Sequence, residues 1–277
     1  MGIVSFSGRR NVKAGELFAG LCQADYRHDG GIRCLRRFRL EPDYFAQLRA
    51  DIERLCRTEQ GSDATQPGHI TYWTRPRGTV TQFSLLNMTG RYDDYSTDHN
   101  LSCLRKSFHG QAAYPVLAGF VSAFPHAVNF RVNVMGPGAQ LGAHEENLII
   151  RTRNGKVGSR LRFHLPVVTN PASEITLDGW VFSLSAGTIY LINHGCVHTA
   201  RNGGSQSRIH LVFDLLLTRA VFDCLFGDAP PPLPLTVVDE DNEEVTPRRV
   251  EPVSPHVKLP PLVAPGDLVH LGWCDVQ

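Results

Sequence analysis

The sequence lacks the features that mark several large classes of protein. Its 277 residues carry 28 Lys and Arg against 27 Asp and Glu, so the net charge is +1. A charge this close to balance argues against a dedicated nucleic-acid surface and against a polybasic membrane patch. No stretch approaches the roughly 20 consecutive apolar residues that a transmembrane helix needs. We therefore expect neither a nucleic-acid partner nor a membrane partner.

Paired cysteines are also lacking. The seven cysteines are an odd number, and no two of them stand in C-x-x-C spacing. This pattern argues against a disulfide framework and against a structural zinc site. The first 15 residues have no apolar core behind basic residues, so they do not resemble a secretory signal. Free thiols without a signal predict a cytoplasmic protein.

Short strands separated by glycine-rich turns dominate the middle of the chain. Ala127–Met135 alternates and is rich in Val, which is typical of a strand. The other strand candidates are Val80–Leu86, Leu148–Thr152, Arg160–Val168, Trp180–Leu184, Thr188–Ile192 and Arg208–Leu217. Helical periodicity is found in Glu41–Arg57, in Tyr114–Phe124 and in a short piece after Leu217. Many short strands without intervening helices predict a mainly β fold, the cupin-like jelly roll or double-stranded β-helix.

This pattern divides the chain into three regions. Residues 1–110 are mixed, with helical segments that we expect to support the barrel, and residues 111–220 form the jelly-roll core. Residues 221–277 are rich in proline but keep apolar clusters, which favours a small C-terminal unit packed on the barrel. Within these regions, Gly136–Gly142 is expected to be a turn, and Asn87–Asn100 a loop that lines the site.

The sharpest chemical feature is His144-Glu145-Glu146, with His198 further along the chain. Residues i and i+2 of a strand point to the same side, so His144 and Glu146 can chelate one cation while Glu145 points away. A jelly roll brings distant strands together, so His198 can complete the set. Two imidazoles and one carboxylate with open positions are the ligands of non-haem Fe(II) oxygenases. The open positions admit a 2-oxo acid and O₂, and the pattern therefore predicts a site for Fe(II), 2-oxoglutarate and O₂.

Basic residues on two predicted strands extend this site. Arg208 follows His198 by ten residues. A guanidinium is always charged and can hold a carboxylate with two hydrogen bonds, so Arg208 is the candidate for the distal carboxylate of 2-oxoglutarate. Arg162 and His164 lie two apart and are expected to face inward, toward the cosubstrate or an acidic group of the substrate. His194 is expected to be structural, and becomes a ligand only if the strand register differs.

These residues resemble a known family. The stretch from Gly142 to Leu217, with GAHEEN, RLRFHLPV, HTARN and RIHLVFDL, resembles the aspartyl/asparaginyl β-hydroxylase-like 2-oxoglutarate oxygenases. Within them it looks most like the bacterial L-proline cis-4-hydroxylase type. The resemblance matches the H-x-D motif of that type to His144–Glu146, its second histidine to His198, and its R-x-H-L-V-x-D strand to Arg208–Asp214.

One residue departs from that pattern. The usual carboxylate ligand is Asp, whereas this chain has Glu146, whose side chain is one methylene longer. The animal aspartyl β-hydroxylases have no carboxylate ligand at all, so two interpretations remain. Either Glu146 binds the metal, or it lies beside a two-histidine site and tunes it.

The resemblance implies an Fe(II)- and 2-oxoglutarate-dependent dioxygenase that hydroxylates an unactivated C–H bond. Its small-molecule substrate is expected to be an amino acid or an amino-acid-derived metabolite, free or carrier-bound. Three alternatives stay open. They are a non-oxygenase metal-dependent cupin such as an isomerase or lyase, a cupin-like binding module with a degenerate site, and an oxygenase acting on a peptide or protein residue.

Overall fold

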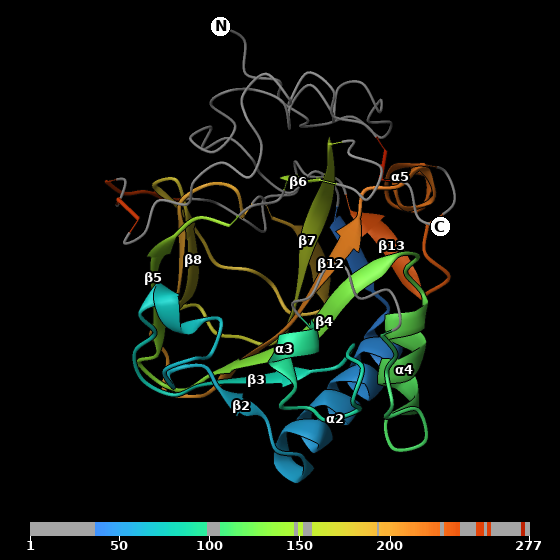
Figure 1. The fold of residues 1–277 in the computed structure, drawn as a ribbon, viewed down its shortest axis with the longest axis horizontal. Helices are drawn as coiled ribbons and strands as arrows, with labels where there is room; N and C mark the ends of the chain where they lie inside the picture. Colours follow the sequence, from blue (N-terminus) through green and yellow to red (C-terminus); the bar gives the residue numbers. More distant parts are fainter. Residues whose placement is uncertain are drawn as a thin grey trace, which may run out of the picture.

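The described strands form two antiparallel sheets (Figure 1). Side chains of both sheets line a cavity between them. The computed structural model describes residues 37–98, 106–146, 149–151, 157–192, 194–227, 230–238, 248–251, 254–255 and 273–274. The larger sheet has the order β13 (Leu235–Val238), β1 (Arg37–Leu40), β10 (Thr188–Leu191), β7 (Val157–Val168), β12 (Arg208–Leu216), β4 (Ala127–Met135), β3 (Val80–Ser84) and β2 (Ser62–Asp63), and β6 (Ile149–Arg151) pairs with β7. The smaller sheet has the order β14 (Arg248–Arg249), β9 (Trp180–Phe182), β8 (Ser173–Leu177), β11 (His198–Asn202) and β5 (Gln140–His144). This arrangement confirms the mainly β jelly roll.

Strict alternation along β12 separates the core from the cavity. Successive side chains of a strand point to opposite faces of the sheet. Leu211 and Phe213 are fully buried in the main apolar core, whereas Arg208 lies on the other face and lines the cavity. The same alternation in β7 puts Phe163 in the core and Arg162 in the cavity. The larger sheet therefore has one apolar face and one strongly polar face.

Two helices cover the apolar face, as Figure 1 shows. They are α2 (Pro42–Thr58) and α4 (Pro115–Ser122), and each has a proline at its start, where the missing N–H costs no helical hydrogen bond. Oδ2 of Asp51 in α2 accepts the backbone N–H groups of Val116 and Leu117 at 2.9 and 3.1 Å, which caps the start of α4. The ring of Phe120 in α4 lies 5.9 Å from that of Phe213 in β12, edge to face. The helices thus hold the larger sheet in place from behind the cavity.

The remaining helical segments are short. They are η1 (Tyr72–Thr74), α3 (Tyr95–Asp98) and α5 (Arg219–Phe226). The side-chain oxygen of Thr218 caps α5 by accepting the backbone N–H of Val221 at 3.1 Å. Within the described residues, no helix combines the length and the apolar character that a membrane crossing requires.

Two sequence predictions about the strands need correction. The segment Gly136–Gly142 is a turn only in its first part, because β5 begins at Gln140. Strands β8 and β11 were also not predicted. All three are short and carry polar residues, and the pairing of β11 with both β5 and β8 stabilises them as strands. Long-range pairing therefore decides their structure, and local periodicity does not.

The C-terminal region contributes to both sheets. Strand β13 pairs with β1, and β14 pairs with β9. The ring of Trp273 lies 5.4 Å from that of Phe222 in α5. Residues 256–272, which include most of the predicted C-terminal apolar clusters, lie outside the described residues. The division into regions 1–110, 111–220 and 221–277 and the packing of the C-terminal unit on the barrel stay predictions. Residues 1–36 lie outside the described residues.

Candidate active site

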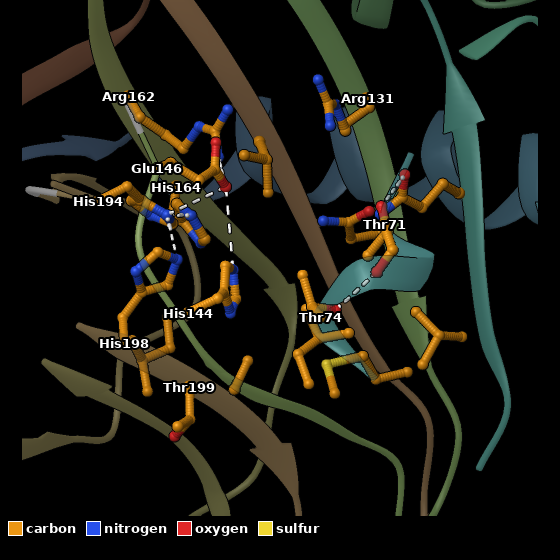
Figure 2. Close-up of a pocket in the computed structure, with 18 of the residues that line it drawn as sticks. Thr71, Thr74, Arg131, His144, Glu146, Arg162, His164, His194, His198 and Thr199 are labelled. Atoms are coloured by element: carbon orange, nitrogen blue, oxygen red, sulfur yellow. Dashed lines mark hydrogen bonds and ion pairs between the residues drawn. The ribbon is translucent and has the colours of Figure 1, made fainter. Parts of the chain in front are cut away.

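A cavity of about 300 Å³ lies between the two sheets. Its walls come from β3, β4, β7 and β12 of the larger sheet, from β5, β8 and β11 of the smaller sheet, and from η1. Figure 2 shows the histidines, Glu146 and Arg162 on one side of it, and Thr71, Thr74 and Arg131 on the other. All six residues that the sequence singled out line this one cavity: His144, Glu146, Arg162, His164, His198 and Arg208.

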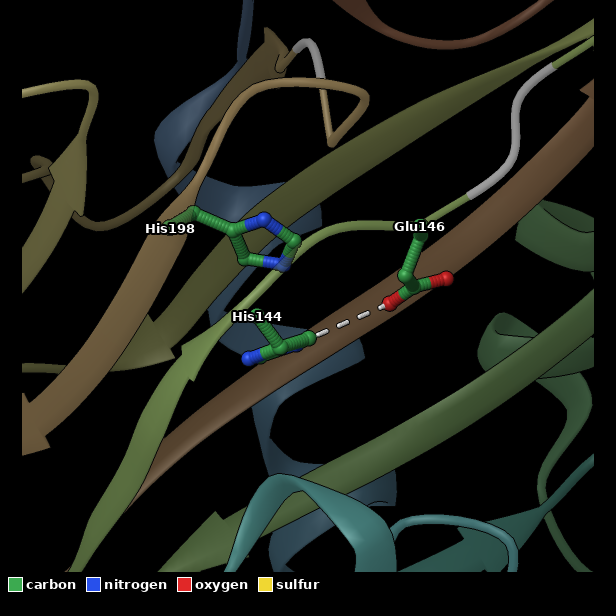
Figure 3. Close-up of side chains that lie close together, drawn as sticks. All are labelled: His144, Glu146 and His198. Carbon is green, nitrogen blue, oxygen red and sulfur yellow. Dashed lines mark ion pairs between the residues drawn. The ribbon is translucent and has the colours of Figure 1, made fainter. Parts of the chain in front are cut away.

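The pairing of β5 with β11 brings the two motif histidines together. His144 and His198 are directly opposite in the antiparallel register, and their ring centroids lie 4.0 Å apart. Glu146 follows just after the end of β5 and turns back toward them (Figure 3). One donor atom from each of the three residues can be chosen so that all lie within 4.8 Å of one another.

Hydrogen bonds to the backbone set the tautomer of both imidazoles. Nδ1 of His144 lies 2.7 Å from the carbonyl oxygen of Gly142, and Nδ1 of His198 lies 2.9 Å from that of Cys196. Nδ1–H must be the donor, so Nε2 carries the lone pair, as in most metal-binding histidines. Burial lowers the pKa of His198 to about 3, so this ring is neutral at neutral pH. Two imidazole nitrogens and a carboxylate are a donor set that fits Fe(II).

Glu146 is already bound to two arginines of β7. Oε1 accepts a hydrogen bond from Nη1 of Arg162, and Oε2 lies 3.1 Å from Nη2 of Arg160. The same Oε1 lies 4.0 Å from Nε2 of His144. Burial alone would raise the pKa of Glu146, but the charges of Arg162 and Arg160 outweigh it and hold that pKa well below its usual range. Glu146 is therefore a carboxylate at neutral pH.

The far side of the arginine pair is held by Asp214. This side chain is fully buried and accepts hydrogen bonds from Nε and Nη2 of Arg162 at 2.6 and 2.8 Å, and from Nη1 of Arg160. Nδ2 of Asn129 donates a further bond at 2.9 Å. Asp214 faces Arg162 across the pairing of β12 with β7. Two guanidinium groups and two carboxylates thus form one charge-balanced network, which is the requirement for burying charge.

Arg208 has no such balance. It is 3% exposed, its Nη2 lies 2.8 Å from Nδ1 of His210, and its Nη1 donates to Sδ of Met135 at 3.0 Å. Within the described residues, no carboxylate lies within ion-pair distance of it. Burial lowers the pKa of Arg208 to about 9, which still leaves it charged at neutral pH. Burying a cation without an anion beside it is unfavourable in free energy, so this guanidinium is suited to binding an anionic ligand.

Two further histidines stand behind His198. Nδ1 of His194 lies 2.9 Å from Nε2 of His198, and Nε2 of His194 lies 3.0 Å from Nε2 of His164. Burial lowers the pKa of both His164 and His194 well below the usual range, so both rings are neutral. His194 therefore lies close enough to be a donor, although the compact group that could hold a metal ion consists of His144, Glu146 and His198.

The rest of the cavity wall is formed by hydrogen-bonding side chains and one aromatic ring. The ring of Trp73 in η1 lies edge to face with that of His144, with centroids 5.2 Å apart. Gln82 and Asn133 come from neighbouring positions of β3 and β4 and also line the cavity. Arg131, two residues before Asn133, forms a buried ion pair with Asp98 at 3.0 Å.

The expected role of the loop Asn87–Asn100 is wrong for its described part. None of residues 87–98 lines the cavity, and residues 99–100 lie outside the described residues. The loop acts indirectly, because its Asp98 pairs with Arg131 in the cavity wall. The described parts of the C-terminal region, also expected to contact the substrate, do not line the cavity either.

Sequence reasoning missed Arg160 and Asp214. Both carry a periodic signal, since Arg160 is two residues before Arg162, and Asp214 is six residues after Arg208, so each lies on the same strand face as a predicted site residue. Glu145 does not line the cavity, which agrees with its expected orientation, but it is only 2% exposed.

The family follows from a direct comparison. A family model described as aspartyl/asparaginyl beta-hydroxylase matches residues 45–217, more than half of the chain. The chain belongs to the aspartyl/asparaginyl β-hydroxylase family. The match to this hydroxylase family spans all three triad residues as well as Arg208 and Asp214. It does not distinguish the proline cis-4-hydroxylase type within the family.

Solved structures are similar to this hydroxylase-family chain only at low levels. A 2OG-Fe(II) oxygenase family oxidoreductase from Burkholderia pseudomallei is 15% identical, with a TM-score of 0.34, and the match covers 62% of this chain and 88% of that one. A prolyl-4-hydroxylase from Pseudomonas putida is 13% identical, with a TM-score of 0.33 and coverages of 72% and 98%. The non-heme alpha ketoglutarate dependent epimerase SnoN from nogalamycin biosynthesis is 15% identical, with a TM-score of 0.41 and coverages of 87% and 96%. No curated protein matches the sequence significantly.

Proposed function

We propose that this member of the aspartyl/asparaginyl β-hydroxylase family is an Fe(II)- and 2-oxoglutarate-dependent dioxygenase that hydroxylates an unactivated C–H bond. One observation carries the proposal. A His-Glu-His group shares a cavity with Arg208, a buried guanidinium for which the described residues offer no carboxylate. A metal site beside an unbalanced buried cation suits a cosubstrate that is both a chelator and a dianion.

Each residue has a distinct role in this proposal. His144, Glu146 and His198 hold the metal through two Nε2 atoms and a carboxylate oxygen. Bound Fe(II) supplies the activation of O₂, which none of these side chains can perform. Arg208 binds the distal carboxylate of 2-oxoglutarate. The buried walls of the cavity keep water away from the reacting groups.

The substrate is proposed to be a small amino acid or an amino-acid-derived metabolite, free or carrier-bound. A cavity of about 300 Å³ is at the small end of the range for ligand sites. Gln82, Asn133, Thr71 and Thr74 offer neutral hydrogen-bonding groups that suit such a molecule. The proline cis-4-hydroxylase type is the specific form of this proposal, and Arg162 and His164 are its candidates for orienting the cosubstrate or an acidic group of the substrate. A cytoplasmic location stays a prediction from the cysteine pattern.

The direct test is cosubstrate turnover. The purified protein is incubated with Fe(II), 2-oxoglutarate and O₂ against a panel of amino acids that includes L-proline, and succinate and hydroxylated product are measured together. Stoichiometric succinate and product with one panel member would support the proposal. Metal-dependent conversion without use of 2-oxoglutarate would indicate an isomerase or lyase. Metal binding without any turnover on amino acids or peptides would indicate a binding module.

A further inference from the structure

Glu146 belongs to two groups of residues at once. It is the carboxylate of the proposed metal site, and it is also an anion of the network that contains Arg160, Arg162 and Asp214. Both of its oxygens are engaged by guanidinium groups, Oε1 by Arg162 and Oε2 by Arg160.

The two groups make different demands on the carboxylate. Adjacent donor atoms on one octahedral cation with bonds of about 2.1 Å lie roughly 3 Å apart. Oε1 of Glu146 lies 4.0 Å from Nε2 of His144, so the two atoms must approach each other before they can bind one ion as adjacent ligands. The guanidinium groups cannot follow freely, because Asp214 holds both of them from the opposite side. Movement toward the metal therefore stretches the hydrogen bonds to Arg160 and Arg162.

The positive charges of Arg160 and Arg162 also oppose metal binding by Glu146. A cation that enters beside Glu146 also comes close to two guanidinium groups. Hydrogen bonds from these groups withdraw electron density from the carboxylate oxygens and make them weaker donors. Among the described residues, Glu146 and Asp214 are the carboxylates paired with these two arginines, so sharing Glu146 with the metal leaves the arginine pair with less compensation from them.

Building on the proposed function, we propose that Arg160 and Arg162 compete with the metal for the Glu146 carboxylate and thereby set the metal affinity of this site. The arginines are positioning residues in this account, because they act on the metal through Glu146. A simple orienting role, in which the arginines aim Glu146 at the metal, predicts the opposite sign when an arginine is removed.

The test is calorimetric titration of the metal-free protein with Mn(II), which needs no turnover. Arg160→Gln removes one bond to Glu146 and leaves Asp214 with its two bonds from Arg162. We expect this variant to bind Mn(II) at least fivefold more tightly than the wild type. In a Glu146→Gln background the same arginine change should have no effect on Mn(II) affinity, because no carboxylate is left to compete for.

A second variant distinguishes the loss of the hydrogen bond to Glu146 from the loss of positive charge. It also provides an independent result if Arg160→Gln does not fold. Arg160→Lys keeps the positive charge but has no planar fork to reach Asp214 and Glu146 together, so it should also bind Mn(II) more tightly, by a smaller factor. Unchanged or weaker binding by both variants would overturn the inference, as would an equal gain in the Glu146→Gln background. Absence of Mn(II) binding by the wild type would overturn the proposed function, and this inference with it.

Discussion

Arg208 is the residue whose surroundings most require a ligand. Arg160, Arg162 and Arg131 each lie within ion-pair distance of a carboxylate, whereas the part of the chain that the structure describes places a histidine ring and a thioether, and no carboxylate, against the guanidinium of Arg208. We predict that Arg208→Gln raises the KM for 2-oxoglutarate at least tenfold, because a lost buried charge-assisted pair costs about 2–5 kcal/mol. Steady-state kinetics in 2-oxoglutarate measures this.

The matched control for Arg208 is Arg49→Gln, a change at an exposed arginine of α2 that pairs with Glu53 on the helix surface. Its KM should equal that of the wild type. Mn(II) affinity should change little in Arg208→Gln, since the described structure places no bond between Arg208 and the triad. A KM for 2-oxoglutarate that is unaffected by Arg208→Gln would remove this residue from the cosubstrate site.

Glu146 permits a prediction about ligand type. If its carboxylate binds the metal, Glu146→Ala loses most activity, while Glu146→Asp retains part of it at a shorter reach. If it only tunes a two-histidine site, Glu146→Ala stays active. We expect the first result, because a carboxylate offsets the charge of Fe(II) and two neutral imidazoles do not. Turnover and Mn(II) affinity of the two variants distinguish these cases.

The neighbouring Glu145 is the control for Glu146, with one adjustment. Glu145 is only 2% exposed, so truncation to Ala risks an effect on folding that has nothing to do with the metal. Glu145→Gln keeps the shape of the side chain and should leave metal affinity unchanged. Loss of metal binding in Glu145→Gln, with Glu146→Ala unaffected, would mean that the residues after β5 are shifted by one position.

At the scale of the element, β12 carries the core on one face and the site on the other. Phe213 is fully buried, stacks on Phe130 with ring centroids 4.6 Å apart, and faces away from the cavity that Arg208 lines. We predict that Phe213→Ala lowers the free energy of unfolding by about 3–5 kcal/mol. Mn(II) affinity of the folded variant should match the wild type. Urea unfolding combined with calorimetry checks both parts, and a loss of affinity as large as the loss of stability would contradict this separation of faces.

Strand β12 and the strands around it show which parts of the fold could be predicted from the sequence. Alternation with many β-branched and aromatic residues marks β4 and β12, and β4 has the predicted bounds, Ala127–Met135. Strand β5 begins inside a glycine-rich segment, and β11 reads HTARN, so neither has a periodic apolar face. Their structure depends on pairing with each other across more than 50 residues of sequence. Local pattern carries no information about such pairing.

The candidate site also has a part that the sequence predicts and a part that it does not predict. His144, Glu146, His198 and Arg208 could be proposed from residue type and spacing, because metal and carboxylate binding demand particular chemistry. The engagement of Glu146 by Arg160 and Arg162 could not, because it depends on where the chain turns after β5 relative to β7. Asp214 could be identified as a partner only once the register of β12 with β7 was known.

At the scale of the whole molecule, five buried histidines of the described residues make folding sensitive to acid. Burial lowers the pKa of His198 to about 3 and that of His69 to about 4, and it lowers those of His164, His194 and His210 well below the usual range. The unfolded chain therefore binds more protons below about pH 6.5 than the folded chain. The stability that these groups contribute is complete above that pH and is lost as the pH falls toward the folded values.

We predict that the metal-free protein loses stability between about pH 7.5 and about pH 5.5, and that the slope steepens toward about 1.4 kcal/mol per pH unit for each such histidine. Asp98 has the opposite effect on the pH dependence of stability. Burial raises its pKa to about 6, so the folded chain binds one more proton at this residue, and the stability that this proton contributes is lost as the pH rises through about 6. Urea midpoints at the two pH values test the prediction. Equal stability at both would mean that the folded protein already holds these histidines protonated.

We propose that His144, Glu146 and His198 hold one Fe(II) that receives 2-oxoglutarate. The most direct measurement is an anaerobic titration of the protein with Fe(II), followed by 2-oxoglutarate, on the wild type, His198→Ala and His194→Ala. The account predicts one equivalent of Fe(II) and metal-dependent binding of 2-oxoglutarate for the wild type, loss of both in His198→Ala, and retention of both in His194→Ala. Wild-type Fe(II) binding by His198→Ala, or its loss in His194→Ala alone, would contradict the ligand set.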